Sequence, residues 1–299
     1  MTVIEGGSLT SVQGIKVGHW SDPGGATGCT VITLPEPNVV AGETRGAAPG
    51  SRETALLEPG MSVETAQAFV LTGGSAFGLA VADGVMGELE ADGRGFPTPA
   101  GVVPIVPTAA IFDLPVIDAS IRPTAESGRL AYSAATGAPV VSGPIGVGTA
   151  ATISKWRGAP NPGALGSAAV RWGDVTVAAL VVLNAIGDAF SLEGEPLSGG
   201  DVVPGPLAIP PPVGENTTLV VVATDAALTR SELTRLCVRA HDALAVCLRP
   251  VHTAFDGDTC FAVATQAVET SLEMPPVNLA EAAFEAVGRS VEAAARSVL

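Results

Sequence analysis

Short runs of β-branched and other apolar residues constrain the fold of this chain more than any other feature. The clearest runs cover residues 175–183 and 219–223. Their length and composition indicate buried strands. Similar patterns, several of them bounded by Pro and Gly, predict further strands in the segments 14–41, 102–106, 140–141 and 255–265.

Helical patterns alternate with these runs. Thr229 precedes Glu232 by three residues, which is the spacing of a capping box at the start of a helix. We predict that this helix runs to about Cys247, because Pro250 stops it. Residues 279–298 are rich in Ala and Glu at helical spacing, with Asn278 as the cap. We also predict helices over residues 62–69 and 75–92. Interleaved helices and buried strands predict an α/β or a layered α+β domain.

Composition and charge exclude several classes of protein. The chain carries 30 acidic and 15 basic residues, and its net charge of −15 repels the phosphates of nucleic acids. No apolar stretch reaches the roughly 18 to 20 residues that a membrane span requires. The first residues lack the basic start and apolar core of an export signal. We therefore expect a cytoplasmic protein that binds neither nucleic acid nor membranes.

Candidate metal ligands are scattered along the chain. The four cysteines form no C-x-x-C pair and lie in apolar surroundings, which favours core residues over a disulfide framework or a zinc site. The three histidines lack the spacing of a metal motif. These residues are Cys29, Cys237, Cys247, Cys260, His19, His241 and His252. We expect no metal ion and no organic cofactor.

A Pro- and Gly-rich stretch over residues 194–216 breaks this pattern, and we predict a loop there. A buried-strand run follows directly, and Asn216 and Thr217 stand at its start. A Thr217 released as a new N-terminus would carry a hydroxyl nucleophile and an amine base on one residue. Since an α-amine has a pKa of about 7.7 to 8.0, it can accept the hydroxyl proton near neutral pH. Asn-Thr is a common dipeptide, and by itself it favours a plain loop that ends where a strand begins.

Four ordered blocks of sequence carry a family signature. The first is Gly46-Ala-Ala-Pro-Gly-Ser-Arg-Glu-Thr54, followed by Leu57-Glu58-Pro59. The other blocks cover residues 72–79 with 83–85, residues 103–106 with 110–114, and residues 146–149 continuing to Lys155. Together they resemble the L-aminopeptidase/D-esterase family, which also holds β-peptidyl aminopeptidases and nylon-oligomer hydrolases. The resemblance extends from about residue 14 to residue 295.

This resemblance implies an N-terminal-nucleophile hydrolase with an α+β fold, a layered α/β/β/α sandwich. Family members are made as precursors that cut themselves, and Thr217 falls at the family's cleavage position. Residues 1–299 would then form a single hydrolase domain, cut into an α chain of residues 1–216 and a β chain of residues 217–299. The resemblance also implies catalysis without a cofactor and a homo-oligomer, commonly a tetramer of αβ units.

The resemblance implies roles for four further residues. Asn184 matches the family's oxyanion donor, and Lys155 matches the lysine beside the nucleophile in the nylon-hydrolase branch. Asp256 and Asp258 match the pair that orients the nucleophile. Because residues i and i+2 of a strand share a face, we expect both carboxylates to converge on Thr217 and to titrate as a coupled pair, one with a raised pKa. The alternatives are a strand-ending Asn, a solvated loop Lys, and an Asp-Gly-Asp turn or weak calcium loop.

Phe112 departs from the family pattern, because many relatives have there a Tyr that helps to bind the oxyanion. We expect an aminopeptidase or amidase that forms an acyl-enzyme on Thr217. Its substrates would be small amino-terminal peptides, amino acid amides or esters, or ω-amino acid oligomers. Two alternatives stay open. One is acyl transfer of the ornithine acetyltransferase type, and the other is a non-enzymatic module in which the Gly-rich residues 143–148 cradle a phosphate.

Overall fold

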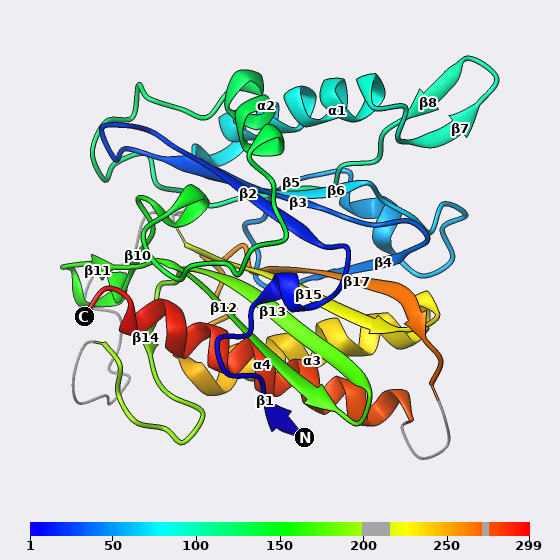
Figure 1. Ribbon diagram of the computed structural model, residues 1–299. Helices are drawn as coiled ribbons and strands as arrows, with labels where there is room; N and C mark the ends of the chain where they lie inside the picture. The colour runs from blue at the N-terminus through cyan, green and yellow to red at the C-terminus, as the bar shows by residue number, and fades with distance from the viewer. Residues whose placement is uncertain (199–215, 271–274) are drawn as a thin grey trace.

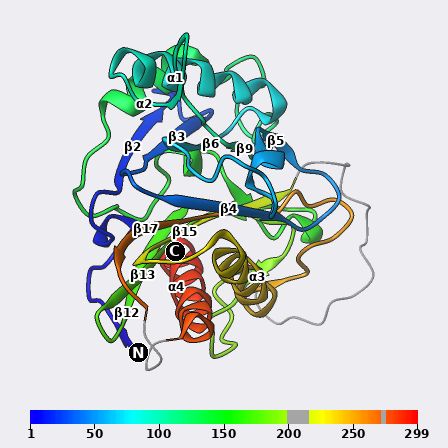
Figure 2. The same cartoon turned by 90° about the vertical axis from the view of Figure 1, so that its right-hand side faces the viewer.

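The chain folds into four layers, which Figures 1 and 2 show from two sides. The structure is a computed structural model and describes residues 1–198, 216–270 and 275–299. Two helices cover a five-stranded sheet, this sheet packs on a six-stranded sheet, and two further helices cover the far side. The predicted α/β/β/α sandwich of the α+β class is confirmed.

The six-stranded sheet contains the two strands that were predicted from the longest apolar runs. Its strands, in spatial order, are β1 (Thr2–Val3), β12 (Leu165–Trp172), β13 (Val175–Asn184), β15 (Thr217–Ala226), β17 (Thr259–Val268) and β4 (Val39–Thr44). β15 pairs antiparallel with β13 and parallel with β17. All residues of β13 are buried, because this central strand is covered on both faces.

The five-stranded sheet comes mainly from the N-terminal third of the chain. Its strands, in spatial order, are β2 (Lys16–Ser21), β3 (Gly28–Thr33), β6 (Ala68–Thr72), β9 (Thr108–Ala110) and β5 (Gly50–Arg52). Three short pairs lie outside the two sheets: β7 (Phe96–Thr98) with β8 (Gly101–Val103), β10 (Thr152–Ile153) with β11 (Asn161–Pro162), and β14 (Asp188–Ala189) with β16 (Leu248–Arg249).

Three apolar layers hold the sandwich together. Helices α1 (Val81–Ala91) and α2 (Ala125–Ser133) pack on the five-stranded sheet, and α3 (Arg230–Cys247) and α4 (Pro276–Arg296) pack on the six-stranded sheet. Between the sheets, the rings of Phe69 and Phe261 stack with their centroids 5.0 Å apart. Among the described residues, no helix has both the length and the apolar character needed to cross a bilayer.

Several local predictions need correction. Residues 62–69 form no helix, because their last residues enter β6, which lies between β3 and β9 at the centre of the sheet. Residues 140–141 form no strand, and β17 begins at Thr259 rather than at residue 255. Residues 75–92 start with a 3-10 turn before α1. The loop predicted over residues 194–216 falls mostly on residues 199–215, which lie outside the described part of the chain.

Candidate active site

Thr217 and Asn184 face each other where their strands meet at one edge of the six-stranded sheet. Thr217 is the first residue of β15, Asn184 is the last residue of β13, and the two are direct register partners. Leu219 and Val182, two residues away in each strand, belong to the core between the sheets. Because side chains alternate along a strand, Thr217 and Asn184 also point between the sheets. Both residues are buried.

The peptide group before Thr217 is held by two hydrogen bonds. In the continuous chain, the Thr217 hydroxyl donates to the carbonyl oxygen of Asn216 at 2.5 Å. The same oxygen accepts the backbone N–H of Gly257 at 2.9 Å. A parallel bridge between Asn216 and Asp256 extends the pairing of β15 with β17 by one step. The threonine hydroxyl and the carbonyl before it are therefore in direct contact.

Lys155 and Asn184 form a second part of the site. The Lys155 ammonium donates to the Asn184 backbone oxygen at 3.1 Å and to its Oδ1 at 3.0 Å. The N–H of Thr152 donates to the same Oδ1 at 3.1 Å. These two donors to Oδ1 orient the amide, and its Nδ2 is buried with no acceptor among the described residues. A buried unpaired donor costs about 1 to 3 kcal/mol, and an oxyanion is the kind of group that would satisfy it.

The turn that carries Lys155 is fixed by its neighbours. Lys155 begins a 3-10 turn that ends at Arg157, and Arg157 forms an ion pair of 2.7 Å with the fully buried Asp188. The N–H of Ser154 donates to Gly187, and the N–H of Trp156 donates to Ile186. These contacts tie the turn to the chain that follows β13, so the ammonium and Asn184 are positioned together.

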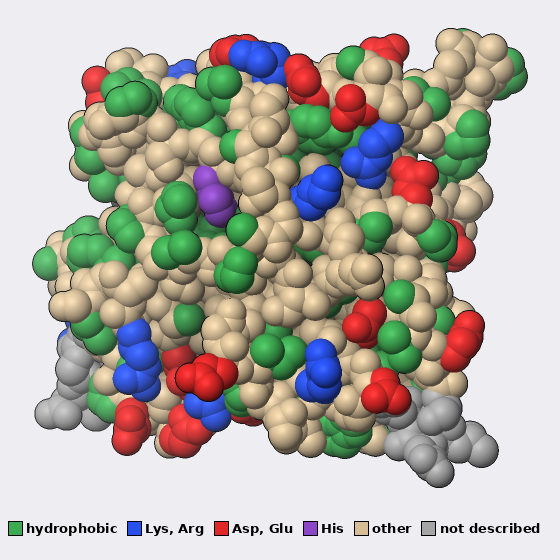
Figure 3. Space-filling model, viewed as in Figure 1, with side chains coloured by type: hydrophobic (Ala, Val, Ile, Leu, Met, Phe, Trp, Pro, Cys, Tyr) green, Lys and Arg blue, Asp and Glu red, His purple; other side chains and the backbone are tan. Residues whose placement is uncertain are grey.

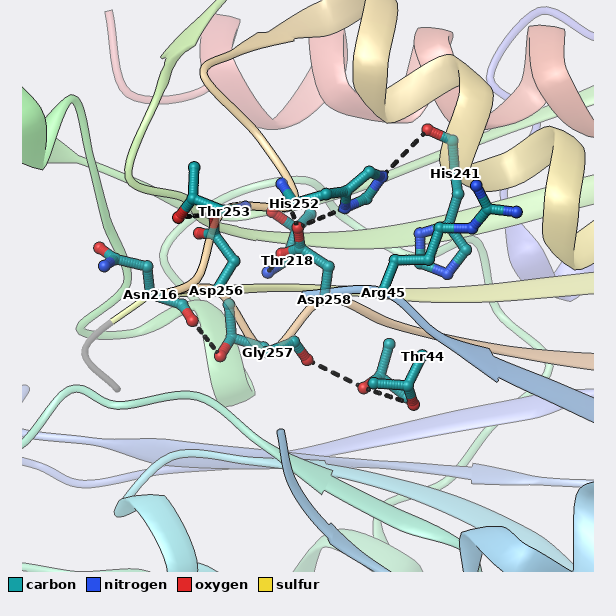
Figure 4. A network of polar contacts seen from close by, with 12 residues as sticks. Thr44, Arg45, Asn216, Thr218, His241, His252, Thr253, Asp256, Gly257 and Asp258 are labelled. Atoms are coloured by element: carbon teal, nitrogen blue, oxygen red, sulfur yellow. Dashed lines mark hydrogen bonds and ion pairs between the residues drawn. The ribbon is translucent and has the colours of Figure 1, made fainter. Parts of the chain in front are cut away.

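Asp256 and Asp258 hold backbone groups around the start of β15. Asp258 accepts the N–H of Thr218 at 2.6 Å through Oδ1 and the Nδ1 of His252 at 2.7 Å through Oδ2. Asp256 accepts the N–H and the hydroxyl of Thr253 at 2.7 and 2.6 Å. Figure 4 shows both carboxylates on the side of the sheet edge that carries His252.

This arrangement corrects the expectation that both carboxylates converge on the Thr217 side chain. The two aspartates precede β17 and do not lie on it. Thr259 begins that strand and Phe261 faces the core between the sheets, so the alternation turns Asp258 toward the α3 side. In the uncut chain, no described hydrogen bond joins either carboxylate to Thr217, and Asp258 instead binds the next residue along the chain.

Burial shifts the pKa values of this group. Burial, together with the negative charge of Asp258, raises the pKa of Asp256 to about 6. For His252, burial lowers the pKa, but the hydrogen bond and charge of Asp258 outweigh it and raise the pKa above its usual value of 6.5. Burial lowers the pKa of His241 to about 4, and its ring lies 4.9 Å from that of His252. Sequence reasoning missed His252, because nothing in the sequence marks a partner six residues before Asp258.

The first signature block and Arg45, the residue before it, hold the acidic segment in place through backbone hydrogen bonds. The N–H of Arg45 donates to Asp258 O at 2.8 Å, and the N–H of Ala48 donates to Asp256 O at 3.0 Å. Gly46 has a φ of +97°, and a Cβ there would lie 2.3 Å from the Asp256 oxygen. A Cβ on Gly257 would lie 2.5 Å from the Ala48 oxygen. Glycine is thus required on both sides of this contact.

Two further blocks meet around Asp113, next to the half-buried Phe112. Asp113 is buried and accepts the Thr27 hydroxyl at 2.6 Å and the Gly74 N–H at 2.7 Å. Burial raises its pKa, although these bonds and the charge of Lys155 oppose the shift. A Cβ on Gly73 would lie 2.1 Å from the Asp113 carboxylate. Glycine in this block therefore permits the close approach of the two segments.

The Gly-rich residues 143–148 do not form a phosphate cradle. The N–H groups of Gly146 and Val147 donate to the hydroxyls of Ser21 and Thr30, and the N–H of Gly148 donates to Ile145 O. Amides that are already paired cannot bind an anion without breaking these bonds. Figure 3 shows the face of the molecule seen in Figure 1, where acidic and basic side chains are interspersed.

Comparisons with known proteins show the family to which this chain belongs. Residues 7–299 match the model of peptidase family S58. The chain is 44% identical over 287 residues to an uncharacterised aminopeptidase of Mycobacterium tuberculosis, which covers 87% of this chain and 82% of the relative. It is 30% identical over 273 residues to a 6-aminohexanoate-oligomer endohydrolase of Agromyces sp., which covers 86% of this chain and 74% of the relative.

Solved structures show the same fold. The L-aminopeptidase D-Ala-esterase/amidase of Ochrobactrum anthropi, described as a variant of the Ntn hydrolase fold, matches with a TM-score of 0.76 at 20% identity and covers 97% of this chain and 85% of its own. A β-aminopeptidase of Burkholderia sp. matches with a TM-score of 0.73 at 22% identity, with the same coverage of both chains. The chain therefore belongs to peptidase family S58 and is a hydrolase with the N-terminal-nucleophile fold.

Proposed function

We propose that this hydrolase cuts its own chain between Asn216 and Thr217 and then uses Thr217 as an N-terminal nucleophile on amide bonds. The single domain would become an α chain of residues 1–216 and a β chain of residues 217–299. The observation that carries the proposal is the buried Thr217 hydroxyl, in hydrogen-bond contact with the carbonyl of the residue before it. A hydroxyl held against its own preceding peptide group is the arrangement that an internal acyl shift requires.

Self-cutting would proceed in two steps, an acyl shift and a hydrolysis. The Thr217 oxygen attacks the Asn216 carbonyl carbon, the C–N bond breaks, and the hydroxyl proton ends on the released amine nitrogen. Water then adds its oxygen to the acyl carbon and returns a proton to the threonine oxygen, which leaves a free carboxyl group on Asn216. The new α-amine, with a reference pKa of about 7.7 to 8.0, can take up the hydroxyl proton of the same residue in later turnovers.

The surrounding residues fit roles in turnover. The Nδ2 of Asn184 has no acceptor among the described residues, which supports its role as an oxyanion donor, and the Lys155 ammonium that holds the amide adds positive charge beside it. Asp258 binds the backbone directly after Thr217 and would orient the new N-terminus, and Asp256 has a pKa raised to about 6 by burial and by the negative charge of Asp258. The acyl-enzyme ester on Thr217 is hydrolysed by water to complete the cycle.

The substrates that we propose are small molecules with a free amino end. They comprise short peptides, amino acid amides or esters, and ω-amino acid oligomers, and the last class is suggested by the relative named as a 6-aminohexanoate-oligomer hydrolase. The phenyl side chain of Phe112 has no hydroxyl group to donate, so oxyanion stabilisation would depend on Asn184 and Lys155. We further propose that αβ units assemble into a homo-oligomer, as a tetramer.

Denaturing electrophoresis with N-terminal sequencing tests self-cutting. We expect two chains, the smaller one beginning at Thr217, and hydrolysis of a panel of aminoacyl p-nitroanilides and amino-acid oligomers. Thr217→Ala should give one uncut, inactive chain. Thr218→Val is the matched control, because it removes a buried hydroxyl that has no partner among the described residues. A single intact chain in active protein, or full activity in Thr217→Ala, would overturn the proposal.

A further inference from the structure

The carbonyl oxygen of Asn216 and the amide of Asn184 lie on opposite sides of β15. β15 has β13 as one neighbour and β17 as the other. Asn184 ends β13, whereas the Asn216 oxygen accepts its backbone hydrogen bond from Gly257, just before β17. The Nδ2 of Asn184 has no acceptor among the described residues while the chain is uncut. The carbonyl that would be cut therefore already has a donor, and that donor is not Asn184.

We propose that the two reactions at Thr217 use different oxyanion donors: the backbone N–H of Gly257 serves self-cutting, and the side-chain amide of Asn184 serves substrate hydrolysis. This inference rests on the proposed function. When the threonine oxygen bonds to the carbonyl carbon, the π electrons of the carbonyl move to its oxygen. A donor already within hydrogen-bond distance stabilises that charge without reorganisation. Gly257 N, at 2.9 Å, meets this condition in the uncut chain.

The Gly257 amide is held rigidly in position. Its hydrogen bond continues the parallel pairing of β15 with β17 through the Asn216–Asp256 bridge. The N–H of Ala48 donates to Asp256 O, which belongs to the same peptide group as the Gly257 N–H, and the N–H of Arg45 donates to Asp258 O, two peptide groups further along. A hydrogen bond of the sheet lies in the plane of the sheet, whereas the Thr217 side chain leaves that plane. The nucleophile can therefore approach the carbonyl from its face while the oxygen stays bonded to Gly257.

Asn184 is positioned for a group that arrives later. Its Oδ1 is occupied by Thr152 and Lys155, so the amide cannot turn to present Nδ2 elsewhere without losing both bonds. Once the Asn216 acyl group leaves Thr217, a substrate carbonyl would bond to the threonine oxygen on the side toward which Thr217 and Asn184 both point, between the sheets. The oxygen of the substrate carbonyl would then accept a hydrogen bond from Asn184 Nδ2, which has no acceptor among the described residues. The Asn216 carbonyl would keep its hydrogen bond from Gly257.

Cell-free synthesis followed by gel electrophoresis over time measures self-cutting, and a p-nitroanilide assay measures turnover. One variant is Asn184→Ala. The other replaces Gly257 by glycolate, so that an ester oxygen stands in place of the N–H without added volume. Its matched control carries glycolate at Gly73, whose N–H donates at 2.8 Å to Gly28 in the other sheet. If the unmodified chain stays single, the proposed function itself fails, and this is seen before any variant is made.

We expect the Gly257→glycolate chain to cut itself roughly 10²- to 10³-fold more slowly than the Gly73→glycolate chain. Asn184→Ala should lower turnover by about the same factor while slowing self-cutting less than about tenfold. Equal cutting rates in the two glycolate chains would overturn the inference. So would a loss of self-cutting in Asn184→Ala as large as its loss of turnover, and this second readout does not depend on the folding of an ester-containing chain.

Discussion

Asp256→Asn should make the folded protein more stable at high pH, because it removes a carboxylate that folding places where ionisation is unfavourable. The pKa of Asp256 rises from 3.8 to about 6 on folding, mainly through burial. The stability from this group is fully present below pH 3.8 and is lost as the pH rises through about 6. Since each tenfold change in proton affinity is worth about 1.4 kcal/mol, the loss amounts to about 3 kcal/mol at most.

The side chain of Asn can replace the acceptor function of Asp256. It presents one oxygen to the N–H and hydroxyl of Thr253, which Asp256 binds at 2.7 and 2.6 Å. We expect Asp256→Asn to raise the free energy of unfolding by about 2 to 3 kcal/mol at pH 8 and to leave it nearly unchanged at pH 4. Urea denaturation at both pH values measures this, with Thr217→Ala as the background so that every chain is uncut.

Asp188→Asn is the control, for which we expect the opposite change in the free energy of unfolding at pH 8. Asp188 is fully buried like Asp256, but Arg157 pairs with it at 2.7 Å. Removal of one partner of a buried ion pair destabilises the protein, so this variant should be less stable at pH 8. The reasoning is refuted if Asp256→Asn is destabilised at pH 8, or if its urea midpoint shifts equally at both pH values.

Two further predictions concern the same segment. His252→Asn keeps a neutral donor for Asp258 but removes a positive charge that lowers the pKa of Asp256. Asp256 should then ionise at higher pH, and the acid limb of the pH profile of substrate hydrolysis should move to higher pH. An acid limb at the same pH as in the unmodified protein contradicts this prediction. Gly46→Ala would place a Cβ 2.3 Å from the Asp256 oxygen and should slow self-cutting at least tenfold. Gly60→Ala, at a similar φ of +91° with nothing within 4 Å, should cost only about 1 kcal/mol of stability and leave the cutting rate unchanged on the same gel time course.

Local sequence patterns were sufficient to predict those strands and helices that are buried on one face, or on all faces, over a long stretch. The runs at 175–183 and 219–223 became β13 and β15, and the capping box at Thr229 begins α3. Local sequence patterns gave a wrong prediction at residues 62–69, where the apolar spacing is typical of a helix. The neighbouring strands β3 and β9 instead draw the end of this segment into the sheet, so tertiary pairing overrides local preference.

The sequence by its residue types, order and family signature predicted the chemistry of the site: a threonine at a strand start, an amide, an ammonium group and two carboxylates. It could not show which group each side chain faces. That depends on the register of β15 against β13 and β17, which joins residues about 40 positions apart and turns Asp258 toward His252 while Thr217 points between the sheets. A shift of one residue in that register would reverse every side chain, so only the packed sheet decides which donor meets which oxygen.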